Sequence, residues 1–353
     1  EPYPRPEASP QDVYENIYSS FHERDLRAIG MVLGADTVVL RPWILSDSRP
    51  KEIVDKMSSF GICKMVPTFH LSKYYAELLQ HGGMQPDTDS NSALFKDFVR
   101  FGSSLDAHKT QNVHVVGWTV DLSLDLESLL GLPLDVYCTP EPTQDKNYRR
   151  YKTFMQILVN WVRQAQSIAP ALVDVPLLLP LDVSRASFSE RDVQEKLTSF
   201  LRCMVGWAPT LFAEDTAGGG ERTRTRWLFS FALPYQDHGA VYFERQLQLV
   251  SGALADTKVR AVIMVGAQAL APDPENVNKI VEDFGNATTA PEQQQVLQRV
   301  TELYEAADRQ QDLFDGLILD EWQDDWDRGG RGPVFLALHS VDAMRQVCDD
   351  GGG

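Results

Sequence analysis

The stretch FDGLILDEWQDDW, residues 314–326, is a short apolar run that ends in carboxylates and tryptophans. A continuous apolar run of this length is typical of a strand that is buried on both faces of a parallel sheet. Ligands of such sheets bind outside the carboxyl ends of the strands. The stretch therefore predicts a buried parallel strand with a polar rim beyond it.

The same alternation of short apolar runs and amphipathic stretches continues along the chain and predicts repeated strand–helix units. Seven strands are expected, at residues 37–43, 62–69, 113–120, 171–181, 205–212, 227–232 and 314–322. Helices are expected at residues 11–33, 50–60, 91–108, 147–168, 189–203, 241–255 and 292–311. An eighth strand would either be the apolar run at 259–265 or precede Glu1.

Length and composition favour one large domain. The chain has 353 residues, 43% of them hydrophobic, which is enough for the core of a single α/β barrel. We expect this domain at residues 11–340, with an insertion near 272–291. A Pro-rich lead-in at 1–10 would precede it, and a tail at 341–353 would follow it.

Charge and cysteine content exclude several classes of protein. With 33 Lys and Arg against 50 Asp and Glu, the formal net charge is -17, which disfavours nucleic acids and anionic membrane surfaces as partners. No apolar run is long enough to span a bilayer. The cysteines and histidines fit no zinc spacing, so neither a metal nor a cofactor is expected. Cys63 and Cys203 lie in apolar runs and are expected to be buried thiols.

Three segments resemble one family of barrels. LGADTVVLRPW, residues 33–43, resembles the second strand of β-glucanosyltransferase and related β-glycosidase barrels. VGWTVDLS, residues 116–123, resembles their fourth strand, and GLILDEWQDDW, residues 316–326, the eighth strand of bacterial glucan-associated glycosidase-like domains. The resemblance covers about residues 11–330. It implies a (β/α)8 TIM barrel of the glycoside-hydrolase type whose first strand is missing or irregular.

The same resemblance implies two catalytic carboxylates, one after strand four and one after strand seven. Ser123 falls on the expected acid and Phe231 on the expected nucleophile. A serine hydroxyl is a poor general acid at neutral pH, and a phenyl ring cannot attack a sugar carbon. Substitute carboxylates would be Asp121, Glu214 or Glu321. We therefore expect a pseudoenzyme, and the alternative is an active retaining β-glycoside hydrolase or transglycosylase with relocated carboxylates.

The acidic, Trp-rich segment after the last expected strand is a candidate carbohydrate platform. Aromatic faces with a few placed polar groups suit a sugar pocket. With other strand-end residues, the expected ligand-binding set is Arg41, Trp43, Trp118, Asp320, Glu321, Trp322, Asp324 and Trp326. The alternative is a packed barrel rim with solvated acids. A calcium site is a third alternative, although the spacing of the acids does not fit an EF-hand loop.

The sequence thus favours a non-catalytic glycosidase-like barrel that serves as a carbohydrate-binding or structural and assembly domain. Its expected partners are a β-glucan-like carbohydrate or neighbouring protein subunits. We expect an extracellular or luminal protein, such as the ectodomain of a membrane protein. Asn286-Ala287-Thr288 would then be a glycosylation site.

Overall fold

The computed structural model describes the part of the chain that forms the sheet and most of its covering helices. The described residues are 26–32, 35–40, 49–71, 93–108, 113–121, 124–125, 175–182, 191–207, 214–215, 222–223, 225–231, 239–255, 257, 259–266, 301–310, 313–320 and 335–340.

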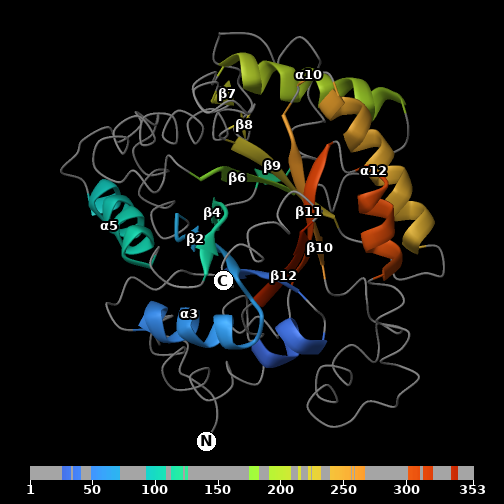
Figure 1. Ribbon diagram of the computed structural model, residues 1–353. Helices are drawn as coiled ribbons and strands as arrows, with labels where there is room; N and C mark the ends of the chain where they lie inside the picture. Colours follow the sequence, from blue (N-terminus) through green and yellow to red (C-terminus); the bar gives the residue numbers. More distant parts are fainter. Residues whose placement is uncertain are drawn as a thin grey trace, which may run out of the picture.

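Eight strands pair side by side and form a barrel-like sheet (Figure 1). Around the sheet they are β1 (Thr37–Leu40), β2 (Lys64–Phe69), β4 (Trp118–Val120), β6 (Leu177–Asp182), β9 (Thr225–Phe231), β10 (Ala261–Gly266), β11 (Phe314–Asp320) and β12 (Phe335–Ser340). The seven strands of this ring from β1 to β11 are mutually parallel. β12 is antiparallel to both β11 and β1, so its two pairings close the order into a ring.

At the place of β4 in the ring, the chain forms three short strands in succession, β3 (His114–Val115), β4 and β5 (Leu124–Asp125), instead of one continuous strand. The two-residue strand β3 pairs with the start of β2, and β4 pairs with its end. The strand β5 then continues along the end of β6. Two further strands, β7 (Glu214–Asp215) and β8 (Arg222–Thr223), form a separate antiparallel pair.

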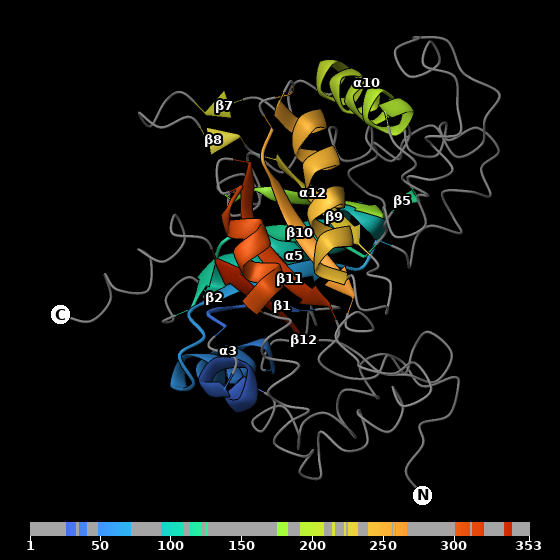
Figure 2. The same ribbon diagram turned by 90° about the vertical axis from the view of Figure 1, so that its right-hand side faces the viewer.

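Helices surround the outer face of the sheet (Figure 1). They are α3 (Arg49–Ser59), α5 (Ala93–His108), α10 (Arg191–Trp207), α12 (Gly239–Ala255), a helical segment at 301–308 and a π-helical turn, η2 (Ala28–Val32). In Figure 2, α12 lies across the face formed by β9 and β10. Within the described residues, no helix is long and apolar enough to cross a membrane.

Along each strand, side chains point alternately outward to the helices and inward to the interior of the ring, because successive residues of a strand face opposite sides of the sheet. On β9, Trp227 and Phe229 belong to the large outer core beneath the helices, whereas Leu228 belongs to a small inner core. The outer core is completed by helix faces of regular spacing, such as Leu197, Leu201 and Met204 of α10. Both faces of the strands are therefore buried, which explains their continuous apolar runs.

The predicted α/β class is confirmed, and parallel strands covered by helices fit an α/β barrel. A helix is described after β1, β2, β6, β9 and β10, so the complete (β/α)8 repeat is shown only in part. The predicted helices at 50–60, 91–108, 189–203 and 241–255 correspond to α3, α5, α10 and α12. The predicted lead-in, insertion and tail lie outside the described residues, as do the helix at 147–168 and Asn286.

One predicted strand is wrong at its start. Residues 205–207 are not strand, because α10 continues to Trp207. The strands β7 and β8, which lie between α10 and β9 in the chain, were also not expected. The apolar run at 259–265, one of the two candidates for a further strand, does contain a strand, β10. The ring position between β11 and β1 is filled by β12, which was not expected.

The cysteine prediction is also wrong. Cys63 and Cys203 are both disulfide-bonded rather than free thiols. Their apolar surroundings, from which the sequence prediction was made, are equally compatible with a half-cystine. The fold therefore contains covalent crosslinks as well as a packed core.

Gly30 provides a test of the packing of η2 against the loop that follows α3. A Cβ at this position would lie 2.1 Å from the Phe60 carbonyl oxygen and 3.1 Å from Ile62 Cγ1. We predict that Gly30→Ala lowers the free energy of unfolding by about 1–3 kcal/mol, because backbone atoms must move to admit the methyl group. The measurement is the midpoint of denaturant unfolding with the disulfides intact.

The matched control is Gly206→Ala in α10, where nothing lies within 4 Å of an added Cβ. This substitution should leave the stability unchanged or raise it by up to about 1 kcal/mol, because alanine favours helix over glycine. Equal midpoints for the two variants would contradict the tight contact at Gly30.

Candidate functional site

A layer of apolar side chains fills the middle of the ring. It consists of inward-facing residues from six strands of the ring: Val39, Val66, Leu178, Leu228, Val262, Met264 and Ile318. All are buried. Such a layer makes the barrel interior a packed core rather than a channel. It also separates two polar ends, which we call the floor, at the amino ends of the parallel strands, and the mouth, at their carboxyl ends.

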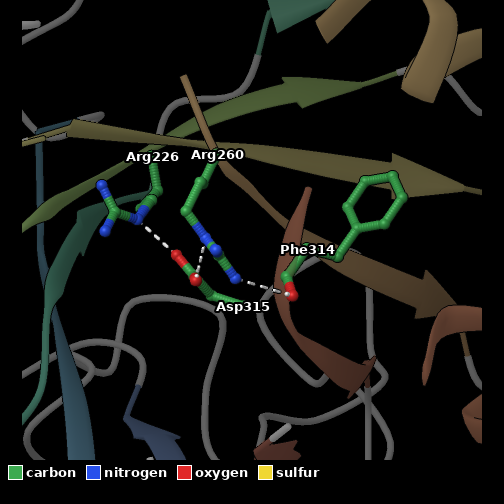
Figure 3. Close-up of polar contacts among 4 residues, drawn as sticks. All are labelled: Arg226, Arg260, Phe314 and Asp315. Atoms are coloured by element: carbon green, nitrogen blue, oxygen red, sulfur yellow. Dashed lines mark hydrogen bonds and ion pairs between the residues drawn. The ribbon is translucent and has the colours of Figure 1, made fainter. Parts of the chain in front are cut away.

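The floor contains Asp315, which binds two arginines (Figure 3). Arg226 Nε donates to Asp315 Oδ2, Arg260 Nε donates to Asp315 Oδ1 at 2.5 Å, and Arg260 Nη2 donates to the Phe314 carbonyl at 3.4 Å. A register shift between β10 and β11 at this point leaves Asp315 without a paired residue on β10. Such a bulge re-aims a side chain, which accounts for a carboxylate that meets both arginines.

A second ion pair lies at the same end. Lys64, which is fully buried, donates to Asp36 at 2.8 Å. Buried charges of this kind persist only when they are paired, because an unpaired charge in a low-dielectric interior is strongly unfavourable. The charged side chains described at the floor are therefore bound to one another, which is a structural role.

The mouth begins with a histidine–aspartate pair. His70 Nδ1 and Asp121 Oδ2 are hydrogen-bonded, and 41% of the histidine side chain and 18% of the aspartate side chain are exposed. The two residues follow β2 and β4, and the Asp121 amide donates to the Phe69 carbonyl at 3.2 Å. A histidine oriented by a carboxylate can exchange hydrogen bonds with ligand hydroxyls and can transfer protons.

Hydroxyl groups lie between this pair and the apolar layer. Thr68 is two residues before His70 on the same face of β2, and Ser230 lies on β9 in register with Met264 of β10 and Asp182 of β6. Both hydroxyl oxygens are buried and have no hydrogen-bond partner. Thr119, which is paired in register with Thr68, differs in that its hydroxyl donates to the Leu178 carbonyl at 2.8 Å.

Two more aspartates end strands at the mouth. Asp182 is the last residue of β6 and is in register with Ser230, and Asp320 is the last residue of β11 and is in register with Gly266. Together with Asp121 after β4, three strands therefore terminate in an apolar residue followed by aspartate. Asp182 was missed by the sequence prediction, although the repeated endings TVD, PLD and ILD were a signal that could have found it.

The structure separates the other predicted site residues. Trp118 is fully buried on the outer face of β4, with its ring 5.6 Å from the ring centroid of Phe98 on α5. This burial opposes the expectation that Trp118 contacts a ligand. Glu214 belongs to the separate β7–β8 pair and not to the ring. The remaining predicted residues lie outside the described part: Arg41, Trp43, Ser123, Glu321, Trp322, Asp324 and Trp326.

The position of the expected nucleophile must be corrected. The prediction counted 205–212 as strand six and therefore placed strand seven at Phe231. If β1 is taken as the second strand, as the resemblance implies, the ring makes β9 the sixth and β10 the seventh. The strand-seven position is thus the end of β10, at Gly266, and no acidic residue follows it before Asp273.

No group of His, Cys, Asp or Glu in the described part of the chain is arranged to hold a metal ion. The described polar groups of the mouth are instead hydrogen-bonding groups: an imidazole, a carboxylate and hydroxyls. Such groups can bind a polar ligand without a metal.

Comparisons with known proteins give little further information. No protein-family model matches the chain, and no curated protein matches it. A search of solved structures finds the catalytic domain of a β-amylase from Paenibacillus polymyxa, with a TM-score of 0.42 and 8% sequence identity, covering 82% of this chain and 95% of that chain. A likeness of this extent carries no conclusion about fold or chemistry, so the fold assignment depends on the strand pairings.

The floor generates a stability prediction. Asp315→Asn keeps the size of the side chain but removes the charge that both Arg226 and Arg260 bind. We expect a loss of about 3–5 kcal/mol in the free energy of unfolding, the usual effect of breaking a buried ion pair. The measurement is the midpoint of urea unfolding with the disulfides intact.

The control is Glu244→Gln, which breaks the exposed ion pair between Glu244 and Arg309. Exposed pairs contribute at most about 1 kcal/mol, so this variant should unfold close to the unmodified protein. A shift for Asp315→Asn as small as that of the control would show that the floor charges are not needed to hold the ring together.

Proposed function

We propose that this chain is a glycosidase-like barrel domain that binds a neutral, β-glucan-like carbohydrate at the mouth and does not hydrolyse it. The observation that carries the proposal is the end of β10. Hydrolysis with retention needs two carboxylates about 5 Å apart, and hydrolysis with inversion needs them about 6.5–9.5 Å apart. The strand-seven position ends in Val265 and Gly266, and the six residues after it, AQALAP, contain no acid.

The mouth nevertheless has the chemistry that a sugar requires. Asp121 and His70 provide a hydrogen-bonded pair, and Thr68 and Ser230 provide hydroxyls. Sugar hydroxyls both donate and accept hydrogen bonds, so they match carboxylates, imidazole and hydroxyls without a change of charge. The predicted tryptophans of the 320–327 segment would add stacking surfaces beyond the rim.

A working hydrolase with relocated carboxylates is the second candidate, and one observation favours it. Asp121 and Asp182 end the neighbouring strands β4 and β6, which pair directly, and Asp320 ends β11. A histidine–aspartate pair is also a common arrangement for proton transfer. This candidate requires measurable turnover, whereas the first requires none.

An extracellular or luminal location is part of the proposal. Disulfides form and persist in oxidising compartments and are rare in the reducing cytosol, and both Cys63 and Cys203 are disulfide-bonded. The sequon at Asn286 is compatible with the same compartment. A neighbouring protein subunit remains an alternative partner for a barrel that does not catalyse.

The experiment uses the full oxidised chain with β-1,3- and β-1,4-linked gluco-oligosaccharides. Binding is measured by isothermal titration calorimetry, and turnover is measured as release of reducing ends. We predict binding without turnover. Asp121→Asn should weaken binding about tenfold or more, because a hydrogen bond to a charged group contributes about 1.5–3 kcal/mol.

Asp55→Asn is the matched control, since Asp55 is an exposed aspartate on α3, remote from the mouth. It should bind as the unmodified protein does. Release of reducing ends that disappears in Asp121→Asn would establish the hydrolase instead. Binding that Asp121→Asn and Asp55→Asn leave equally intact would place the carbohydrate site away from the mouth.

A further inference from the structure

We infer that the mouth receives the terminal unit of an uncharged glycan end-on, and that the buried hydroxyls of Thr68 and Ser230 contact it below the rim. This inference rests on the proposed carbohydrate-binding function and makes it more specific. It names a chain end rather than an internal segment, and a neutral rather than an acidic sugar. It also adds two contact residues that neither the sequence nor the comparisons indicated.

Thr68 is the first line of evidence. Its side chain is fully buried, yet its hydroxyl has no hydrogen-bond partner. It shares the inner face of β2 with Val66 of the apolar layer, because residues two apart on a strand face the same way. A buried hydroxyl without a partner is unfavourable by about 1–3 kcal/mol, so a group that supplies the missing partner gains affinity at this point.

The neighbouring threonine shows that the strands themselves do not require this arrangement. Thr119 is in register with Thr68 and equally buried, but its hydroxyl donates to the Leu178 carbonyl. One of two adjacent threonines is therefore satisfied by the sheet, and the other is directed at the interior without a partner. A ligand hydroxyl is the missing partner that we infer.

Ser230 provides an independent contact from another part of the ring. Its hydroxyl oxygen is buried and unpartnered, and Leu228, two residues earlier, belongs to the apolar layer. β4 and β6 separate β9 from β2 in the ring, so the two hydroxyls approach the interior from different sides. We infer that a polar group of the ligand supplies the missing partner at this hydroxyl as well.

Geometry determines how such a group enters. The pairings of the eight strands close around the interior, and the apolar layer blocks the way from the floor. Entry is therefore from the mouth, past His70 and Asp121. The end of a chain can reach below that rim, whereas an internal segment would have to fold back on itself to do so.

Charge determines what enters. Aspartates lie at the carboxyl ends of β4, β6 and β11, and of the inner-face positions described at the mouth only His70 has a basic side chain, which is bound to Asp121. The chain as a whole has a formal net charge of -17. An acidic sugar would therefore be repelled, and a neutral one would find acceptors for its hydroxyl hydrogens.

The test uses the full oxidised chain and the near-isosteric variant Thr68→Val, with Ser230→Ala as a second variant. The probes are a neutral β-glucan trisaccharide and the same trisaccharide whose terminal unit is oxidised to a uronic acid. We expect each variant to bind the neutral probe roughly three- to tenfold more weakly, the effect of one lost hydrogen bond. We also expect the uronic acid probe to bind at least tenfold more weakly than the neutral one.

A readout without ligand separates binding from structure. Because the Thr68 hydroxyl has no partner, Thr68→Val should keep or raise the midpoint of thermal unfolding, whereas Thr119→Val breaks an existing hydrogen bond and should lower it. If the unmodified protein binds neither probe, the proposed function itself fails. If it binds the neutral probe but Thr68→Val and Ser230→Ala bind it equally well, or if the uronic acid probe binds as tightly, the inference is overturned.

Discussion

Asp315 is the charge on which the interior of this ring depends. Arg226 and Arg260 enter the floor from neighbouring strands, and each of them is bound by one oxygen of the same carboxylate. Arginines inside a ring of strands need a compensating charge, and a bulge in β11 brings Asp315 between them. With Lys64 paired to Asp36 nearby, the floor closes one end of the interior with ions that satisfy each other.

Because the floor is closed in this way, we place the proposed binding site at the mouth of the ring. The charges described at the floor are ion-paired, and the middle level is apolar. Among the described residues, buried side-chain polar atoms without a hydrogen-bond partner occur at Gln246 of α12 and at the mouth. At the mouth these are the hydroxyls of Thr68 and Ser230. Unsatisfied polar groups are unfavourable for the free protein, so their presence at the end where barrel sites lie favours a binding function over simple packing.

Local patterns in the sequence were sufficient for the parallel strands and most of the helices. The apolar runs at 64–69, 177–182 and 314–320 are strands because both of their faces are covered, which makes the run continuous in the sequence. Patterns failed where two structures share one signal. The short apolar run around Val205 is compatible with a strand or with a helix. The helical spacing of the buried residues from Leu197 to Met204 shows that it belongs to α10, which ends at Trp207.

The candidate site was predictable only in part, because the register of the paired strands determines which side chains meet. Asp121 was identified from the ending of one strand, but its partner His70 is 51 residues away along the chain and meets it only through the pairing of β2 with β4. Trp118 shows the converse, since a tryptophan at the end of a strand can face either side of a sheet. Which hydroxyl lacks a partner is likewise invisible in a sequence, since Thr68 and Thr119 differ only in what surrounds them.

The antiparallel strand β12 has a consequence for how the protein is made. β1, near the start of the described chain, pairs on one side with β12, near its end, and Thr37 lies opposite Leu338. During synthesis β1 and β11 therefore remain open sheet edges until β12 has emerged from the ribosome. Exposed edges are templates for pairing with other chains, and contacts so distant in sequence form slowly. The nascent chain thus has a window of vulnerability to aggregation that ends only when β12 is inserted.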